Sequence, residues 1–276
     1  ALNPQEVVNK YKEIGYDFTC LSDHLWKDAK FAAETVLETK HLNQKDFITI
    51  PSAELHCLGK KYVKDGLWHI VANGLPLDFK CADEKETAPL LVQRAIEAGA
   101  FVTIAHPEWY SLTFDECLSL SHAHGIEIYN HSCHIEAQRG FGTAAADYLL
   151  QENNRIFLTA TDDSHFKMQD SGGGWVMVAA DKLSESSILN ALKNGQYYSS
   201  TGVEIFEFEI DNYQVNIQCS PSNQVCIVGQ GAKSMSQNGK NITQAEFDLK
   251  KYPSDWFRVS IANDSGDFAW TNPVWL

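Results

Sequence analysis

The stretch RIFLTATDDSH (155–165) passes from apolar residues into two acidic residues and a histidine. Similar apolar runs that stop on, or contain, a metal-binding type of residue are YDFTCLSDH (16–24), FITIPSAE (47–54), LWHIVANGL (67–75), FVTIAH (101–106) and GIEIYN (125–130). Such short runs, separated by segments of helical period, predict strands that alternate with helices. In a barrel of that kind the C-terminal strand ends open onto one face, so side chains far apart in sequence converge there.

The residues at these strand ends predict a metal site. A lone histidine is often a partly buried structural residue. A carboxylate at the end of an apolar strand, however, is costly to bury unless it is paired or coordinates a cation. Four imidazoles with two carboxylates and no neighbouring cysteine suit zinc, iron or manganese. The candidate ligands are His24, Glu54, His69, His106, Asp163 and His165.

Taken in order, the motifs resemble those of the PHP (polymerase and histidinol phosphatase) family of metal-dependent phosphoesterases. The resemblance covers most of residues 1–202 and implies an α/β fold, a distorted TIM-like (β/α)7 barrel. It also implies hydrolysis of small phosphorylated substrates, with nucleotide-derived ones the first to test, by a metal-bridging hydroxide, with two or three divalent ions (Zn, Mn or Fe) as cofactors. The segments are S-D-H (22–24), A-E-L (53–55), W-H-I (68–70), A-H-P (105–107), E-I-Y-N (127–130), D-D-S-H (162–165) and ALKNGQYYSSTG (191–202).

The same resemblance implies a role for each ligand. Glu54 would bridge two ions, with His69 and His106 on one of them and Asp163 on the other. Glu54 and Asp163 are therefore the expected catalytic carboxylates. His24 with His165 would hold a third ion.

Three further residues are expected to support this site. Asp23 can orient the neighbouring His24 by a hydrogen bond to its ring. Asn130 and Arg139 are expected to bind substrate. Arg139 is the candidate phosphate clamp, because a guanidinium group grips two oxygens at once. A surface ion pair is the alternative reading of Arg139.

The beginning of the sequence departs from the family pattern. Family members open with a strand that carries H-x-H, followed by a further ligand. Here Asn3-Pro4-Gln5-Glu6 predicts instead the capped start of a helix. We expect roughly twenty further residues upstream, the length of one strand and its loop.

Composition restricts the class of protein. The 276 residues are 44% hydrophobic, enough for a barrel and a small second domain. There is no apolar stretch of membrane-spanning length and no signal-peptide pattern, so no membrane association is expected. The seven scattered cysteines favour buried thiols in the reducing cytoplasm. A net charge of −14 without a basic run argues against long nucleic acid as a partner. Nothing indicates the oligomeric state.

The hydrophobic period changes at Gly202 and predicts two domains. Residues 1–202 would form the metal-dependent hydrolase domain. Residues 203–276 would form a small antiparallel, β-sandwich-like domain of period-two strands, with a polar loop over 229–241. In the first domain, helices are expected at about 4–14, 28–40, 86–98, 113–122, 134–150 and 184–194.

Other histidines and other functions stay open. His56 follows Glu54 by two residues, so both share one face of a strand and His56 can approach the site. His131 and His134 are expected near the mouth. The sequence does not choose between phosphoester hydrolysis and hydrolysis of a carboxylic ester or amide, because metal-activated water attacks either centre. A non-catalytic PHP-like binding module is the third alternative, if the first strand is truly absent.

Overall fold

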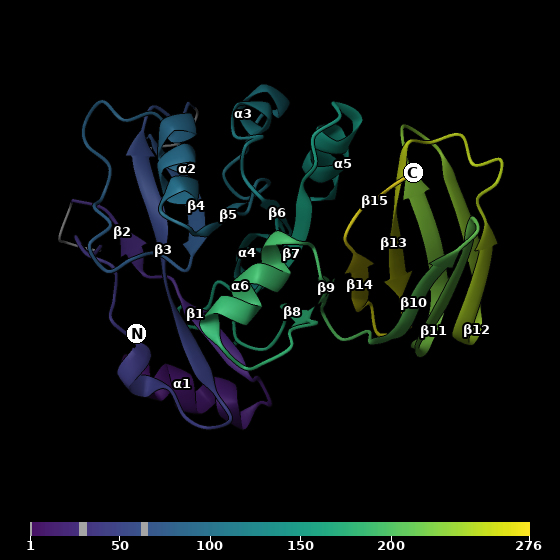
Figure 1. Ribbon diagram of the computed structural model, residues 1–276, viewed down its shortest axis with the longest axis horizontal. Coiled ribbons are helices and arrows are strands. Elements are labelled where there is room, and N and C mark those ends of the chain that lie inside the picture. The colour runs from purple at the N-terminus through teal and green to yellow at the C-terminus, as the bar shows by residue number, and fades with distance from the viewer. Residues whose placement is uncertain (1, 28–31, 62–65) are drawn as a thin grey trace.

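A computed structural model describes residues 2–27, 32–61 and 66–276, and within them the chain forms two curled sheets and six α-helices (Figure 1). The expected α/β class is confirmed. The strands β1–β7 make one hydrogen-bonded sheet and β8–β15 make another. A closed (β/α)7 barrel is therefore not shown.

The first sheet brings metal-binding residue types together through its register. Its strand order is β1-β3-β4-β5-β6-β7, with β2 beside β3. β4 is antiparallel to both its neighbours, and the register places His24 opposite Glu54 and His56 opposite His69. The strands are β1 (Phe18–Leu21), β2 (His24–Leu25), β3 (Ile48–Leu58), β4 (Leu67–Asn73), β5 (Phe101–Ile104), β6 (Gly125–Asn130) and β7 (Phe157–Thr161).

Most helices lie where the sequence predicts them. The first begins with the expected capping box, in which the Asn3 side chain accepts from the Glu6 N–H at 3.0 Å and the Glu6 carboxylate accepts from the Asn3 N–H at 2.8 Å. The helices are α1 (Pro4–Glu13), α2 (Ala88–Glu97), α3 (Phe114–Ser119), α4 (His131–Ala137), α5 (Thr143–Gln151) and α6 (Glu185–Lys193).

The expected helix over 134–150 is two helices, α4 and α5. The chain leaves α4 at Gln138, whose φ of 58° is left-handed. It then passes close to the backbone of β6 at Gly142, where a Cβ atom would lie 2.0 Å from the Glu127 carbonyl oxygen. Only glycine fits that approach, and the two glycines at 140 and 142 themselves weaken a helix, so both packing and local sequence favour the break.

The helix expected over 28–40 is wrong where the structure describes the segment; residues 28–31 lie outside the described residues. Ala33 instead pairs with the chain at β2. Its N–H donates to the His24 carbonyl at 2.8 Å, and its own carbonyl accepts from the Trp26 N–H at 2.9 Å. This backbone pairing overrides the helix propensity of the sequence.

The second sheet has the order β10-β11-β13-β14-β9-β8, with β12 beside β11 and β15 beside β13. All its pairs are antiparallel, as expected for the strands after Gly202. Two of its strands, β8 and β9, precede Gly202, and β9 pairs both with β8 and with β14, which follows Gly202. The division into 1–202 and 203–276 stays a prediction. The strands are β8 (Trp175–Val178), β9 (Tyr197–Ser200), β10 (Ile205–Asp211), β11 (Gln214–Gly229), β12 (Ser234–Asp248), β13 (Trp256–Ala262), β14 (Phe268–Thr271) and β15 (Val274–Trp275).

The polar loop expected over 229–241 is wrong, because β12 already begins at Ser234 and pairs with β11. Most of β12 is exposed on both faces, and only Ala245 and Phe247 are buried within it. A period-two hydrophobic signal needs one buried face. The polar part of β12 therefore has no such signal, although residues 234–238 pair with β11.

The two sheets are fastened together through α5. Arg258 of β13 is buried and donates from Nε and Nη2 to the Asp147 carboxylate of α5, both at 2.8 Å. Trp256 and Trp270 of the second sheet belong to the hydrophobic core of the first. In Figure 1, α5 accordingly lies on the side of the first sheet that faces β13.

The outer edge of β7 is closed by side chains from the second sheet. The Leu158 N–H donates to Asn272 Oδ1 and the Ala160 N–H donates to Ser199 Oγ, both at 2.8 Å. Among the described residues, β1 pairs only with β3, and β8 only with β9. The strands β1 and β8 both border one cavity of about 1020 Å³, called the main cavity below.

Candidate metal centre

Glu54 stands at the centre of the candidate site. It lies on β3, is only 6% exposed, and three imidazoles contact its carboxylate. His24 Nδ1 lies 2.9 Å from Oε2, while His69 Nδ1 and His106 Nε2 lie 2.6 and 3.2 Å from Oε1. The three histidines come from β2, β4 and the residue pair after β5, so separate elements converge on one buried carboxylate as expected.

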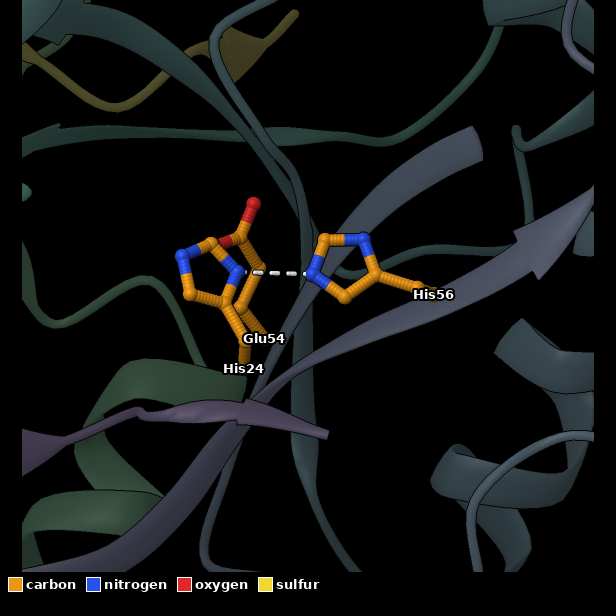
Figure 2. Close-up of side chains that lie close together, drawn as sticks. All are labelled: His24, Glu54 and His56. Carbon is orange, nitrogen blue, oxygen red and sulfur yellow. Dashed lines mark hydrogen bonds and ion pairs between the residues drawn. The ribbon is translucent and has the colours of Figure 1, made fainter. Parts of the chain in front are cut away.

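His56 is a fourth histidine of this cluster. Its Nε2 lies 2.7 Å from His24 Nδ1 (Figure 2), and its Nδ1 lies 2.9 Å from the Trp68 carbonyl oxygen. Because a carbonyl only accepts, Nδ1 carries the proton and Nε2 carries the lone pair. Burial lowers the pKa of His56 to about 4, which keeps the ring neutral. A neutral imidazole with one nitrogen fixed by a carbonyl is the form that binds metals.

These residues fit a metal ion. In the part of the chain that the structure describes, two groups have ligand atoms that all lie within 4.8 Å of one another, and both contain Glu54. The donors are imidazole nitrogens and a carboxylate oxygen, a set that suits zinc, iron or manganese. The groups are His24, Glu54 and His56, and Glu54, His69 and His106. Below, these five residues are called the Glu54 cluster.

The Glu54 cluster is electrostatically coupled. Burial opposes the charged form of His106, yet its hydrogen bond to Glu54 raises its pKa to about 9. The hydrogen bond to the same carboxylate also raises the pKa of His24. Burial opposes ionised Glu54, but the His69 charge and the hydrogen bonds from the rings hold its pKa well below the ordinary value. A bound cation would replace the protons on these rings.

Asp163 and His165 lie beside the Glu54 cluster on the segment after β7. Asp163 Oδ2 accepts from Asn130 Nδ2 at 3.2 Å, and its Oδ1 lies 3.8 Å from His165 Nδ1. The His165 ring centroid is 5.8 Å from that of His24. Burial, with the charge of Glu54, raises the pKa of Asp163. The structure thus gathers four of the six expected ligands in the Glu54 cluster and places Asp163 and His165 beside it, outside both groups of clustered donors. The roles of all six and the number of ions stay predictions.

Asp162 has a role that the sequence alone does not indicate. This buried carboxylate accepts from the N–H groups of Gly172, Gly173 and Gly174 at 2.6, 2.8 and 2.8 Å, and from the Tyr11 hydroxyl at 2.9 Å. It thereby holds both ends of the loop that carries Asp163. The run of three glycines before β8 is the signal in the sequence that indicates a close backbone approach.

Glu127 also has a role that the sequence alone does not indicate, because it stands in the middle of β6 and not at a strand end. It is buried and accepts from the His106 N–H at 2.7 Å and from Asn130 Nδ2 at 2.9 Å. Burial, with a contribution from the Asp163 charge, raises its pKa to about 7. Its contact supports His106, whose φ of 23° is unusual for a residue other than glycine.

Asn130 and Arg139, the expected substrate contacts, lie in different environments. Asn130 is fully buried, its amide donates to Glu127 and Asp163, and its Oδ1 caps α4 by accepting from the Cys133 N–H at 3.0 Å. Arg139 is exposed and is not among the residues that line the main cavity. Its role as a phosphate clamp stays a prediction without support from the geometry.

His131 and His134 do not join the Glu54 cluster. They line a second, smaller cavity together with Tyr129 and residues of the second sheet. All seven cysteines are free thiols. None of the helices in the described ranges is long and apolar enough to cross a membrane.

Comparison with known proteins returns no match. No protein-family profile matches this chain, and a search of curated proteins finds no similar sequence. The functional argument therefore depends on the geometry and chemistry of the site.

Proposed function

We propose that this chain is a metal-dependent hydrolase that cleaves small phosphorylated substrates, with nucleotide-derived ones among them. One observation carries the proposal: Glu54 is buried, is shared by two groups of imidazole ligands, and lines a cavity of about 1020 Å³. Two divalent ions about 3.5–4 Å apart orient a phosphoryl group and stabilise its entering and leaving oxygens. The shared carboxylate supports such a pair.

Each residue of the site would have a distinct role in the proposed hydrolysis. The imidazoles of the Glu54 cluster would hold the ions, and Glu54 would lie between them. Asp163, whose pKa is raised by burial and by the charge of Glu54, would accept a proton from the attacking water. His165 lies close enough to stabilise the Asp163 carboxylate before that transfer. Asn130 and Glu127 would keep Asp163 and His106 in place.

The finer fold assignment belongs to the same proposal. We infer that the first sheet, with β8 and β9 of the second, forms one distorted PHP-type (β/α)7 barrel whose seam lies between β1 and β8, and that β10–β15 belong to the small C-terminal β domain. The ordered motifs support it, as do the unpaired edges of these strands along the main cavity. The free thiols support a reducing compartment, the cytoplasm.

The test is a side-by-side assay of the full chain with a phosphomonoester, a phosphodiester and a neutral aryl carboxylate ester. Zn, Mn and Fe are each added to metal-stripped protein. Glu54→Gln removes the shared charge and nearly preserves shape. His122→Asn, which alters an exposed histidine outside the main cavity, is the matched control. We expect a phosphoester to be the fastest substrate, activity only with metal, and loss of activity in Glu54→Gln alone.

Two outcomes would replace the proposal. Faster hydrolysis of the aryl ester than of both phosphoesters would identify a carboxylic ester hydrolase. Metal binding that depends on Glu54, without turnover of any of the three substrates, would favour a non-catalytic binding module.

A further inference from the structure

The second cavity, of about 420 Å³, lies on the face of β6 opposite to the Glu54 cluster. Tyr129 and Asn130 are neighbours on β6, so their side chains point to opposite faces of the sheet. Asn130 contacts Asp163, whereas Tyr129 lines the second cavity with residues of α4 and of the second sheet. None of the described residues that line this cavity belongs to the Glu54 cluster, although Ser171 and Gly172 line both cavities.

Aromatic rings form much of its wall. The ring centroids of Tyr129 and Phe141 are 5.3 Å apart, and those of Phe141 and Phe268 are 5.8 Å apart, both in edge-to-face geometry. One face of Phe268 is covered by Trp270, at 5.3 Å between centroids and 9° between planes. Ring faces of tyrosine and phenylalanine attract cations through their quadrupoles.

The charged side chains that line the second cavity also favour a cation. Asp267 is its only lining carboxylate, and no lysine or arginine lines it in the described ranges. Asp267 Oδ2 accepts from Asn263 Nδ2 at 2.9 Å. Burial, with the charges of Asp162 and Asp267, raises the pKa of Tyr129 to about 12, so the surroundings of this hydroxyl are electronegative.

Two histidines that line the second cavity offer nitrogen atoms that can accept hydrogen bonds. His131 Nδ1 lies 3.0 Å from the Tyr129 hydroxyl. His134 Nδ1 is a buried atom without a hydrogen-bond partner among the described residues. A neutral imidazole can accept a hydrogen bond at such a nitrogen.

From these contacts we propose that the second cavity binds a small organic cation, an ammonium or quaternary ammonium group. The cation lies between the rings of Tyr129, Phe141 and Phe268 and the Asp267 carboxylate. An anion would face Asp267 without a compensating cation, and a neutral apolar ligand would cover that carboxylate without supplying an opposite charge. A metal ion fits less well, because the groups of three clustered donors in the described chain all lie at Glu54.

The experiment compares choline with 3,3-dimethyl-1-butanol, its neutral analogue of nearly the same shape. Titration calorimetry on the full chain, in the presence of a chelator, measures both ligands. We expect choline to bind and the neutral analogue to bind about tenfold more weakly, because only choline has the charge that the rings and Asp267 attract. The chelator separates this result from the proposed hydrolase activity, since no metal takes part.

Two variants locate the binding. Asp267→Asn keeps the shape of the side chain and removes the charge, and Phe141→Leu keeps an apolar side chain and removes the ring. Each should weaken choline about tenfold while thermal unfolding shows that the chain is folded. The proposal is overturned if choline does not bind at about 10 mM, if both ligands bind equally, or if neither folded variant weakens choline.

Discussion

The two halves of the candidate metal site differ in what holds their side chains in place. His24, Glu54, His56 and His69 are fixed by the register of β2, β3 and β4, so each has a partner directly opposite on a neighbouring strand. The other half, Asp163 and His165, lies on a loop after β7. A ligand on a paired strand is positioned by the ladder itself. A ligand on a loop needs separate anchors.

The loop that carries Asp163 and His165, called the loop half below, has such anchors. Asp162 ties the two ends of the loop together through three glycine N–H groups and the hydroxyl of Tyr11. Asp163 itself has a φ of 53°, a conformation that costs a non-glycine residue energy unless its surroundings enforce it. We infer that the strand half provides metal affinity, while the loop half depends on Asp162 for its geometry.

The largest effect is expected from the strand half, at Glu54. Glu54→Gln removes the charge that both ligand groups share, so kcat/KM for the best phosphoester should fall about a thousandfold or more. Steady-state assays at saturating metal measure it. Asp163→Asn, in the loop half, should lower kcat more than it weakens metal binding. Equal loss of metal in both variants would erase the distinction between the halves.

A smaller effect is expected at His56, the ligand that the ladder places opposite His69. His56→Asn removes the free Nε2, and metal affinity should fall about 10- to 100-fold. Competition with a chromophoric chelator gives the affinity. His122→Asn serves as the control, since this exposed histidine touches neither cavity. An unchanged affinity in His56→Asn would place His56 outside the ligand set.

For the loop half, Asp162→Asn tests the anchor. The amide keeps the size of the carboxylate but loses the charged acceptor of four hydrogen bonds. We expect the free energy of unfolding to fall by about 2–3 kcal/mol in urea titrations. Tyr11→Phe removes one of those bonds and should cost about 1 kcal/mol. If Asp162→Asn cost no more than Tyr11→Phe, the glycine contacts would not anchor the loop.

The pKa values predict how metal binding depends on pH. The pKa of His106 is raised to about 9, so this ring is protonated at neutral pH and must lose its proton when an ion binds. Apparent metal affinity should therefore rise with pH until about 9. Without metal, the stability of the fold changes with pH in the opposite direction. The stability that protonated His106 contributes is complete below its ordinary pKa of 6.5, and it is lost as pH rises through the raised pKa of about 9.

Calorimetry in buffers of different ionisation enthalpy counts the protons that are released when metal binds. Unfolding curves of metal-stripped protein, measured at several pH values, give the loss of stability with rising pH. A metal affinity that does not change between pH 6.5 and 9 would contradict the assignment of His106.

The smallest effect is expected at Arg139. Because its side chain is exposed and outside the main cavity, Arg139→Ala should change KM by less than about twofold. A clear rise in KM with kcat unchanged would restore the phosphate clamp expected from the sequence.

The sequence predicted the residues at strand ends better than the residues whose role depends on contacts in the folded chain. Candidate ligands at strand ends, such as Glu54 and His106, could be named because an apolar run that stops on a polar residue is visible in the sequence, and the structure places both in the Glu54 cluster. Glu127 and Asp162 were missed as site residues, because their importance comes from hydrogen bonds to backbone N–H groups that only the folded chain brings near. His56 was visible only as a period-two neighbour of Glu54.

The errors in the fold have a similar cause. The segment around Ala33 has helix-forming residues, but pairing with the chain at β2 decides its conformation. The interruption before α5 is imposed by the close approach of Gly142 to the Glu127 carbonyl. The strand β12 is exposed over most of its length, so its sequence resembles a loop. In each case a long-range contact overrides or hides the local pattern.

The most direct test of the account is the metal content of the purified chain. Elemental analysis is made on wild type, Glu54→Gln and His122→Asn, prepared in parallel without chelator. We predict at least one transition-metal ion per chain in wild type and in His122→Asn, and almost none in folded Glu54→Gln, because both ligand groups share Glu54. Equal metal content in wild type and Glu54→Gln would contradict the proposed metal centre.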